Sequence, residues 1–386
     1  MRIVFVTTYD AQDITEYSGT PFFIKKTFSE KGIELKFINN LLSIDKLSFS
    51  RRLRYILYNK VLRGKLGRYI SYYQPQNLKF FARQVKEKLS EIDADIILSP
   101  SAIPIAYLDT NIPIVLWTDA TFKVMHNYYG IYKKLSRRTV KDCHLYEKNA
   151  LKRASLAIFS SEWAANSAIE YYGSDPDEVK VLPYGANIDC ERTEDNIKTI
   201  NENKSKSICK LLFIGQEWYR KGADVAVRIA INMNEKGINT ELSIVGCLPP
   251  NSLPLPDYID VHGFIKKSTK EGKNIINNLY AESHFFILPT IADCTPIVFA
   301  EANSYGLPVI TTNTGGISSI IKDDFNGKMF GTEIDIRFCS DYLIKYFLDY
   351  DAYKEFSLKA FNEYKLRLNW ESSISKIVAY FKEIIN

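Results

Sequence analysis

Short apolar runs alternate with longer amphipathic stretches along most of the chain. In the first half, strand-length runs that end at turn-forming or polar residues lie at 2–8, 34–39, 95–99, 112–117, 156–160 and 179–182. A helical pattern fills residues 21–31, between the first two runs. Strands that alternate with helices predict a parallel sheet covered on both faces.

The same alternation restarts after a polar stretch at residues 191–206. Strands are expected at 210–215, 242–245, 259–261, 285–288 and 308–311, and helices at 222–236, 272–281, 296–305 and 370–385. We therefore predict an α/β protein with two doubly wound, Rossmann-like domains, 1–187 and 188–366. Such folds bind ligands at the carboxyl ends of their strands, but the fold alone does not specify a reaction.

Composition narrows the class of protein. Of the 386 residues 46% are apolar and 25% are charged, and no apolar run approaches the ~20 residues of a membrane span. The N-terminus enters a strand directly and lacks the parts of a signal peptide. The six cysteines form no C-x-x-C pair, which favours reduced thiols over disulfides or a zinc site. We expect a cytoplasmic protein.

Two acidic residues follow the apolar run at 285–288. Asp293 lies in a short loop, and Glu301 lies two turns inside a helix that is predicted to begin near Pro296. Backbone N–H groups at such a helix start bind phosphate, and a carboxylate at Glu301 accepts hydrogen bonds from sugar hydroxyls. The residues expected around the phosphate are Thr295, Pro296, Ile297 and Val298.

A second candidate site follows the strand expected at 210–215. Gly215 at the strand end lets the backbone approach a ligand closely. Arg220 and Lys221 are placed at a predicted helix start, where they suit phosphate oxygens. The alternative is a solvated basic helix N-terminus, which is disfavoured because cations at that end oppose the helix dipole.

These acids, together with Ala302, the Gly-Leu-Pro-Val at 306–309 and the Gly-Gly at 315–316, resemble the signature of the family 4 retaining glycosyltransferases of GT-B fold. The resemblance implies that Asp293 contacts the donor sugar, that Glu301 holds the ribose hydroxyls, and that Lys221 binds the donor phosphates. It also implies two facing domains, with a C-terminal helix at 367–386 that returns to the first domain.

The sequence departs from the family pattern at four places. The first acid is Asp293 rather than glutamate, and the usual Gly-Phe-Gly after it reads Cys-Thr-Pro at 294–296. Ser319 replaces an acid, and Gln216 replaces an arginine whose role Arg220 is expected to take. These changes affect the identity of the donor more than its binding.

The resemblance also marks residues elsewhere in the chain. It assigns an acceptor-side loop to Ser18, Gly19 and Thr20, although Thr20 with Pro21 also reads as an ordinary helix cap. Asp119 is the candidate for contacting the donor sugar or the acceptor hydroxyl, with a helix cap as the alternative, and His126 ranks below it. Phe264 either stacks on the nucleotide base or fills the core.

Other motifs have plainer interpretations. Ser161 is expected to cap a helix rather than to react. The D-x-D patterns at 93–95 and 175–177 open a strand and occupy a proline turn, so neither is expected to hold a metal. We predict metal-independent catalysis, in which cations and a helix end stabilise the developing charge.

Residues 46–86 contain no acid and interleave eleven Lys and Arg with eight Tyr and Phe. Residues 1–185 carry 27 Lys and Arg against 19 Asp and Glu, whereas the remainder carries 23 against 26. Basic amphipathic segments with aromatic residues bind anionic membranes. The alternative is a solvated helical insert, and a nucleic acid partner is not expected.

The predicted function is transfer of a hexose or related sugar from a UDP- or GDP-sugar to a hydroxyl acceptor, soluble or lipid-linked, without a cofactor. Polysaccharide, lipopolysaccharide or glycolipid synthesis is the expected setting. The alternatives are a nucleotide-sugar-binding or membrane-docking protein without catalysis, and a GT-B epimerase or phosphorylase.

Overall fold

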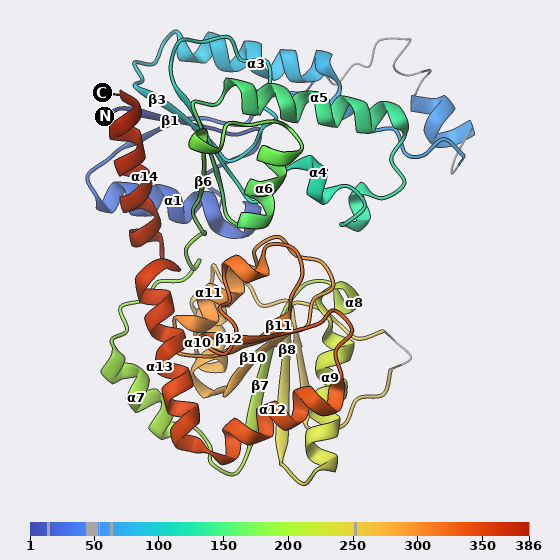
Figure 1. Cartoon of the computed structure of the whole chain (residues 1–386), viewed down its shortest axis with the longest axis vertical. Coiled ribbons are helices and arrows are strands. Elements are labelled where there is room, and N and C mark those ends of the chain that lie inside the picture. Colours follow the sequence, from blue (N-terminus) through green and yellow to red (C-terminus); the bar gives the residue numbers. More distant parts are fainter. Residues whose placement is uncertain (14–15, 44–52, 54, 62–64, 251–252, 386) are drawn as a thin grey trace. The chain divides into compact units, whose positions relative to one another are not determined.

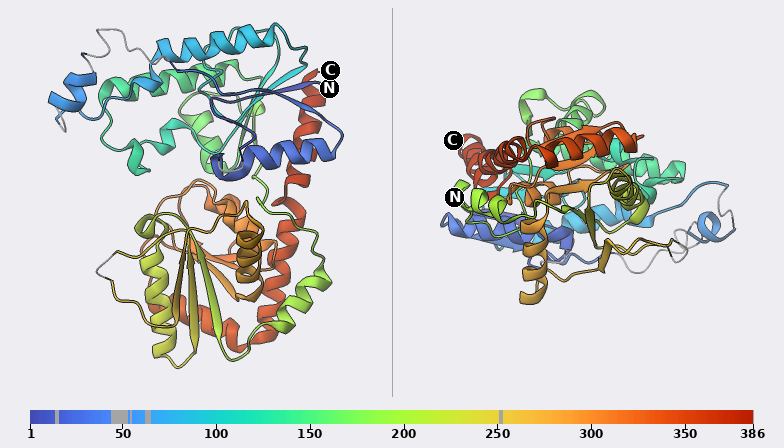
Figure 2. Two further views of the ribbon diagram at one scale, coloured as in Figure 1. Left: turned by 180° about the vertical axis from the view of Figure 1, so that it is seen from behind. Right: turned by 90° about the horizontal axis from the view of Figure 1, so that it is seen from below.

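The computed structural model describes the chain except residues 14–15, 44–52, 54, 62–64, 251–252 and 386. It divides into two compact units: the first is Met1–Pro183 with Ser373–Asn386, and the second is Tyr184–Ser372. Each unit is built on a six-stranded parallel sheet with helices on both faces (Figures 1 and 2). The predicted fold class is confirmed. The boundaries fall at 183 and 372, against the expected 187 and 366.

The sheet of the first unit has the strand order β2-β1-β3-β4-β5-β6. Every residue of β1 is buried because helices cover both faces of the sheet, and its sequence is accordingly a continuous apolar run. The strands are β1 (Ile3–Val6), β2 (Leu35–Ile38), β3 (Ile96–Ser99), β4 (Ile114–Thr118), β5 (Leu156–Phe159) and β6 (Val179–Val181).

The α-helices of the first unit surround this sheet (Figures 1 and 2). They are α1 (Thr20–Glu30), α3 (Pro75–Leu89), α4 (Phe122–Met125), α5 (Arg137–Arg153), α6 (Glu162–Glu170) and the part of α14 (Trp370–Ile385) from Ser373 onward. On α14, Ile374, Ile377 and Phe381 form a buried apolar stripe, and the ring of Phe381 stacks on Phe28 with centroids 6.3 Å apart. Ser161 caps α6, as predicted, by accepting the Ala164 N–H at 3.3 Å.

The second unit repeats the architecture with the strand order β12-β11-β10-β7-β8-β9. Its strands are β7 (Cys209–Ile214), β8 (Thr240–Val245), β9 (Ile259–Gly263), β10 (Phe285–Leu288), β11 (Val309–Thr312) and β12 (Gly327–Phe330). Its helices are α7 (Glu194–Asn203), α8 (Trp218–Lys221), α9 (Ala223–Glu235), α10 (Lys270–Glu282), α11 (Ile297–Asn303), α12 (Ile336–Leu348) and α13 (Tyr350–Arg367).

Five elements of the second unit were not predicted: α7, α8, α12, α13 and β12. The polar stretch at 191–206 contains α7, whose start is fixed by a capping box between Thr193 and Asn196. Strand β12 is short, carries Lys328 and begins at a glycine, so it lacks a clear strand pattern. It extends the sheet by pairing with β11.

Strand order locates the candidate binding edge in each sheet. In the second unit the chain runs from β7 outward to β9, then returns to place β10 on the other side of β7. Ligands of doubly wound sheets bind at the carboxyl ends of strands where the order reverses in this way. The segments that follow β7 and β10 carry Lys221 and Asp293. The corresponding reversal in the first unit lies between β1 and β3.

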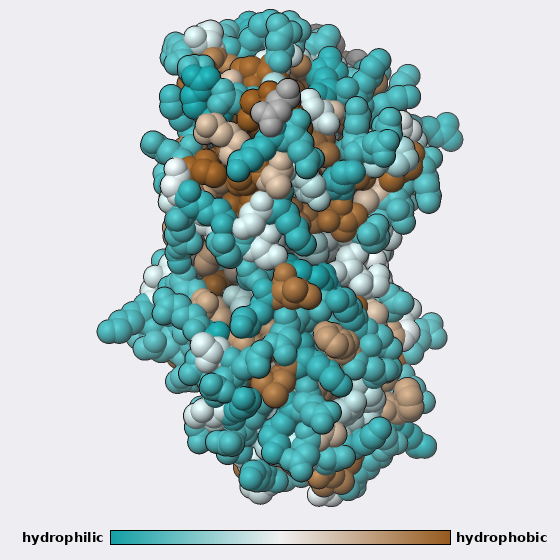
Figure 3. Space-filling view, turned by 60° about the vertical axis from the view of Figure 1, so that its left-hand side comes forward, coloured by the Kyte–Doolittle hydropathy of each residue, from teal (hydrophilic) through white to brown (hydrophobic). Residues whose placement is uncertain are grey.

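On the face drawn in Figure 3, hydrophilic residues cover most of the surface and hydrophobic ones lie between them in small groups. None of the helices in the described ranges combines the length and the apolar character that crossing a bilayer requires. The two D-x-D patterns have structural roles. Arg2 pairs with Asp93 and Asp95 at the start of β3, and Asp175 caps a turn by accepting the Asp177 N–H.

Candidate functional site

The loops after β7 and β10 are joined by hydrogen bonds at the switch point of the second sheet. The Arg220 carbonyl accepts both the Thr290 hydroxyl and the Ile291 N–H, each at 2.9 Å. In return, the Arg220 guanidinium donates to the Ala292 carbonyl at 2.7 Å. The two loops therefore form one rigid edge, which fixes the side chains that follow them.

Lys221 and Asp293 form an ion pair on this edge. The Lys221 Nζ lies 2.6 Å from the Asp293 Oδ2, and the two side chains are 15% and 11% exposed. The Arg220 Nη1 lies 3.7 Å from the same oxygen, and its Nε donates to the Glu217 carboxylate at 2.7 Å. Partly desolvated ion pairs hold their geometry better than exposed ones. Two cations and a carboxylate are thus held together at the end of β7.

Arg220 and Lys221 do not occupy the helix start that the sequence suggested. They form the last turn of α8, a four-residue helix that ends at Gly222 in the left-handed conformation. Cations at a helix C-terminus agree with the helix dipole, so the electrostatic objection to an ordinary basic helix end does not apply. The case for Lys221 rests instead on its pairing with Asp293.

Gly222 allows this arrangement because its φ of +80° suits glycine and its α-carbon lies against the loop after β10. A β-carbon there would come within 2.2 Å of the Pro289 carbonyl oxygen. Gly222→Ala is expected to lower the free energy of unfolding by about 3 kcal/mol or more, through left-handed strain plus this collision. Gly237→Ala is the control, since Gly237 has a φ of +84° and open space around it. It should cost only ~1–2 kcal/mol. Urea denaturation measures both, and equal losses would contradict the collision.

Glu301 lies on α11 and is 2% exposed. Its Oε2 accepts the Lys267 Nζ at 2.5 Å and the Tyr280 hydroxyl at 2.9 Å. Burial, with the charge of Glu301, raises the pKa of Tyr280 well above its ordinary value, so this hydroxyl stays a donor. Sequence reasoning missed both partners. Lys267 comes from the loop after β9 and Tyr280 from α10, and no local motif links either residue to Glu301.

The other donor-site candidates lie at the same ends of the strands. Gly215 follows β7, and its N–H donates to the Val245 carbonyl at 2.9 Å. Helix α11 begins at Ile297, with Pro296 as its cap, one residue later than expected. Phe264 follows β9 and is 74% exposed, so the interpretation as a core residue is wrong and stacking on a ligand remains a prediction. The remaining candidates, Thr295 and Val298, are half-buried.

In the first unit the predicted acceptor-side loop has an unusual backbone. Tyr17, Ser18 and Gly19 all have positive φ, and three successive left-handed residues are costly outside glycine. Gly19 precedes α1, and Thr20 is already helical, so Thr20 is not the cap. The Tyr17 hydroxyl donates to the Asp119 Oδ1 at 3.1 Å. This contact brings the loop and Asp119 together, as a common site requires.

Asp119 lies in the loop after β4 and does not cap α4, because Thr121 holds that position. Behind the loop lies Glu147 on α5, 3% exposed, whose Oε2 accepts the Phe122 N–H at 3.4 Å. Burial raises the pKa of Glu147 to about 8; the charge of Asp119 also raises it, while the Phe122 N–H lowers it. His126 stacks on Phe122, with ring centroids 5.3 Å apart, and no contact to Asp119 is found for it among the described residues.

Glu147 predicts a pH dependence of stability. Between about pH 4.5 and 8 the unfolded chain releases this proton while the folded chain keeps it, so stability falls as pH rises. Glu147→Gln should remove this contribution, which is at most about 1.4 kcal/mol per pH unit. Urea midpoints of both proteins from pH 5 to 8 test this. Parallel pH profiles would show that Glu147 is ionised in the folded protein.

With this geometry in place, two family profiles match the chain. The profile described as "Glycosyltransferase Family 4" matches residues 26–190, nearly all of them in the first unit. The profile described as "Glycosyl transferases group 1" matches residues 209–337, in the second unit, a range that includes Lys221, Asp293 and Glu301.

The chain belongs to the family 4 glycosyltransferases. One curated family relative is D-inositol 3-phosphate glycosyltransferase of Paenarthrobacter aurescens, 23% identical over 192 residues, or 47% of this chain and 46% of the relative. Another is lipopolysaccharide glucosyltransferase WaaG of Escherichia coli, 27% identical over 161 residues, or 40% and 42% of the two chains. This chain spans between 42% and 65% of the length of the first curated relatives it matches.

Solved structures support the family's fold over the whole chain. HepE of Anabaena, in a structure described as a complex with UDP-glucose, aligns with a TM-score of 0.62. The alignment covers 99% of this chain and 100% of HepE at 13% identity. At that identity the likeness establishes the GT-B fold.

Proposed function

We propose that this protein transfers a sugar from a UDP- or GDP-sugar to a hydroxyl acceptor and retains the anomeric configuration. The observation that carries the proposal is the Lys221–Asp293 pair at the β7/β10 switch point, in the unit that also holds Glu301. The family membership and the UDP-glucose complex of HepE support a nucleotide-sugar donor. Synthesis of a polysaccharide, lipopolysaccharide or glycolipid is the proposed setting.

In this proposal Lys221 exchanges partners when the donor binds. Its ammonium leaves Asp293 for an oxygen of the diphosphate. Arg220, whose Nη1 lies 3.7 Å from the Asp293 Oδ2, adds a second cation beside the diphosphate. Asp293 then accepts a hydrogen bond from a hydroxyl of the donor sugar. The exchange replaces one charged partner of Lys221 by another, so little desolvation is needed at the moment of binding.

Glu301 is proposed to hold the ribose. Its Oε2 is occupied by Lys267 and Tyr280, whereas Oε1 has no hydrogen-bond partner among the described residues. A ribose diol offers two donors to a carboxylate, and buried charged hydrogen bonds of this kind are the stronger ones. Phe264, exposed at the end of β9, is proposed to stack on the base.

The reaction breaks the bond between the anomeric carbon and the diphosphate oxygen and forms one to the acceptor oxygen on the same face. The acceptor proton passes to the leaving phosphate oxygen, so no enzyme-linked intermediate is needed. Lys221 and Arg220 stabilise the negative charge that develops there, which is the task a metal performs in other transferases. Asp119 and the loop from Ser18 to Thr20 are proposed to orient the acceptor.

Titration calorimetry with UDP, GDP and ADP in the presence of EDTA tests the donor assignment. One nucleotide is expected to bind at least ten-fold more tightly than the others, without a divalent cation. Binding that appears only when magnesium is added would refute metal independence. Failure of all three nucleotides to bind, with and without magnesium, would refute the donor site itself.

We further propose that residues 46–86 dock the enzyme peripherally on the inner face of the cell membrane. Of these, 46–52, 54 and 62–64 lie outside the described residues. Residues 55–61 project beyond the ends of α3 and α5 (Figure 1). The described part of 46–86 carries six apolar side chains that are each at least 38% exposed: Leu53, Tyr55, Ile56, Leu57, Val61 and Leu66.

Liposome flotation tests this docking. Polybasic segments gain ~1 kcal/mol per Lys or Arg near an anionic surface, and salt screens the gain. The protein should float with vesicles containing anionic lipid at low salt, and less so at high salt. Ile56→Ser with Leu57→Ser should reduce flotation, and Ile275→Ser, also an exposed apolar residue but in α10, should not. Equal failure to float in every condition would leave an ordinary solvated basic surface.

A further inference from the structure

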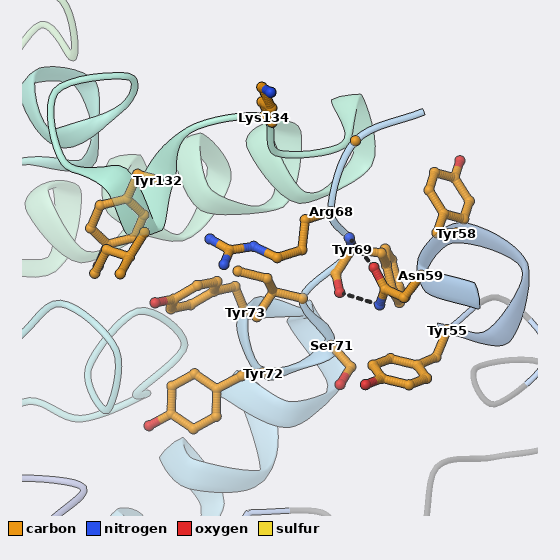
Figure 4. A pocket seen from close by; sticks show the side chains of 13 residues that line it. Tyr55, Tyr58, Asn59, Arg68, Tyr69, Ser71, Tyr72, Tyr73, Tyr132 and Lys134 are labelled. Atoms are coloured by element: carbon orange, nitrogen blue, oxygen red, sulfur yellow. Dashed lines mark hydrogen bonds between the residues drawn. The ribbon is translucent and has the colours of Figure 1, made fainter. Parts of the chain in front are cut away.

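A pocket of about 670 Å³ lies in the first unit, beside the projecting segment (Figure 4). This volume is within the range of small-molecule sites, ~300–1,000 Å³. Its walls are dominated by tyrosines: Tyr55, Tyr58, Tyr69, Tyr72, Tyr73 and Tyr132. We call it the tyrosine pocket. It is separate from the donor-site residues, all of which belong to the second unit.

Backbone hydrogen bonds fix the walls of the tyrosine pocket. The Arg68 N–H donates to the Lys134 carbonyl at 2.7 Å, and the Arg68 carbonyl accepts the Ser136 N–H at 2.9 Å. The Asn59 side chain bonds both the N–H and the carbonyl of Tyr69, at 3.0 and 2.9 Å. The segments around Asn59 and Arg68 are thus joined to each other and to the distant segment at 134–136, so the pocket is formed before a ligand arrives.

Charge in the tyrosine pocket has one sign. Arg68 and Lys134 line it, and no Asp or Glu is among the described residues that do so. The Arg68 side chain extends across the pocket toward Tyr73 and Tyr132 (Figure 4), and it forms no ion pair within the described part of the chain. A guanidinium that lines a pocket binds a carboxylate or phosphate in a bidentate manner.

The aromatic walls select for sugar rings. A tyrosine offers an apolar face and a hydroxyl on one rigid side chain, which matches the apolar faces and hydroxyl edges of a pyranose. The pocket also contacts the loop after β1, in the unit that holds the acceptor-side residues. The Tyr72 hydroxyl donates to the Thr8 hydroxyl, just after β1, at 3.4 Å. Burial, and to a smaller extent the charge of Asp119, raises the pKa of Tyr132.

We propose that the tyrosine pocket binds a sugar residue of the acceptor that carries an acidic group. The acid is held by Arg68 and Lys134, and the ring lies against the tyrosines. The proposal deepens the proposed function, since it names the acceptor as an anionic glycan whose acidic residue is bound apart from the reacting hydroxyl.

Cellobiouronic acid, cellobiose and glucose 6-phosphate are the probes, titrated by ligand-observed NMR. Cellobiouronic acid is expected to bind at least ten-fold more tightly than neutral cellobiose, and glucose 6-phosphate shows whether phosphate serves as well as carboxylate. Arg68→Gln should weaken the acidic probes ten- to a hundred-fold. Arg83→Gln is the control, since Arg83 is an exposed arginine on α3 outside the pocket. It should leave all affinities unchanged.

UDP or GDP affinity, measured on the same variants, separates this proposal from the proposed function. Arg68→Gln should bind the nucleotide as the wild type does, which also shows that the protein is folded. If no nucleotide binds while acidic sugars bind through Arg68, the proposed donor site is refuted and the proposed acidic-sugar pocket is supported. Equal affinity for cellobiose and cellobiouronic acid would overturn the proposal, and so would an Arg68→Gln variant that binds the acidic sugars as tightly as the wild type. The proposal is also overturned if the protein binds anionic vesicles through Arg68 but binds neither acidic sugar.

Discussion

Lys221→Ala is expected to lower kcat/KM for the nucleotide-sugar donor about 100-fold. A hydrogen bond to a charged group contributes ~1.5–3 kcal/mol, and the upper end applies because the charge on the leaving diphosphate grows in the transition state. Lys221 is only 15% exposed, so water replaces its ammonium poorly. Donor affinity, measured by calorimetry, should fall less than kcat/KM.

Lys273→Ala is the matched control. Lys273 lies in the same unit, is 55% exposed, and pairs with Asp189 at 2.9 Å. Its loss should leave both kinetic constants unchanged. Removing Lys221 also takes away a charged partner of Asp293, whose Oδ2 lies 3.7 Å from Arg220, so thermal unfolding of the variant must be recorded. A stable Lys221→Ala protein with wild-type turnover would remove Lys221 from the site.

Glu301→Gln is expected to weaken UDP or GDP binding by about ten- to fifty-fold, because a neutral amide binds the ribose hydroxyls less strongly than a carboxylate. Pyrophosphate has no ribose, so its affinity should change little. This contrast assigns the loss to the ribose. Calorimetry with both ligands on the same protein measures it.

The chain supplies a control for burial. Glu363 is also 2% exposed and forms ion pairs with Lys322 and Arg367, but it lies on α13, away from the ends of β7 and β10. Glu363→Gln should cost stability, as breaking a buried pair does, without changing nucleotide affinity. If Glu301→Gln lost stability alone and kept its nucleotide affinity, Glu301 would be a structural acid like Glu363.

Alternating apolar runs predicted most of the fold, since a strand buried on both faces is readable from its own residues. Strand β12 and helix α7 were missed for a physical reason. Strand β12 contains Lys328, and α7 is polar over most of its length. Both elements are therefore stabilised by the elements around them and not by an apolar pattern of their own. Prediction of Arg220 and Lys221 at a helix start failed because α8 is only one turn long and Gly222 ends it.

For the site, the sequence indicated single residues but not their pairings. Asp293 and Lys221 were assigned to different parts of the donor, whereas in the structure they bind each other. Lys267 and Tyr280 come from two other elements and meet Glu301 only in three dimensions. The contact of Tyr17 with Asp119 spans 102 positions and has no sequence signal.

Donor turnover measures the central claim most directly. Wild-type protein and the Lys221→Ala variant are incubated with UDP- and GDP-sugars in EDTA, first without an acceptor and then with acidic and neutral glycan acceptors. The release of nucleotide diphosphate is measured, and the anomeric configuration of the product is determined by NMR. The account predicts slow donor hydrolysis by the wild type alone, faster release with an acceptor, a retained configuration, and about 100-fold less turnover for Lys221→Ala. Nucleotide binding without turnover under any acceptor condition would instead mark a nucleotide-sugar-binding protein, and an epimerised or phosphorolysed product would mark a different GT-B enzyme.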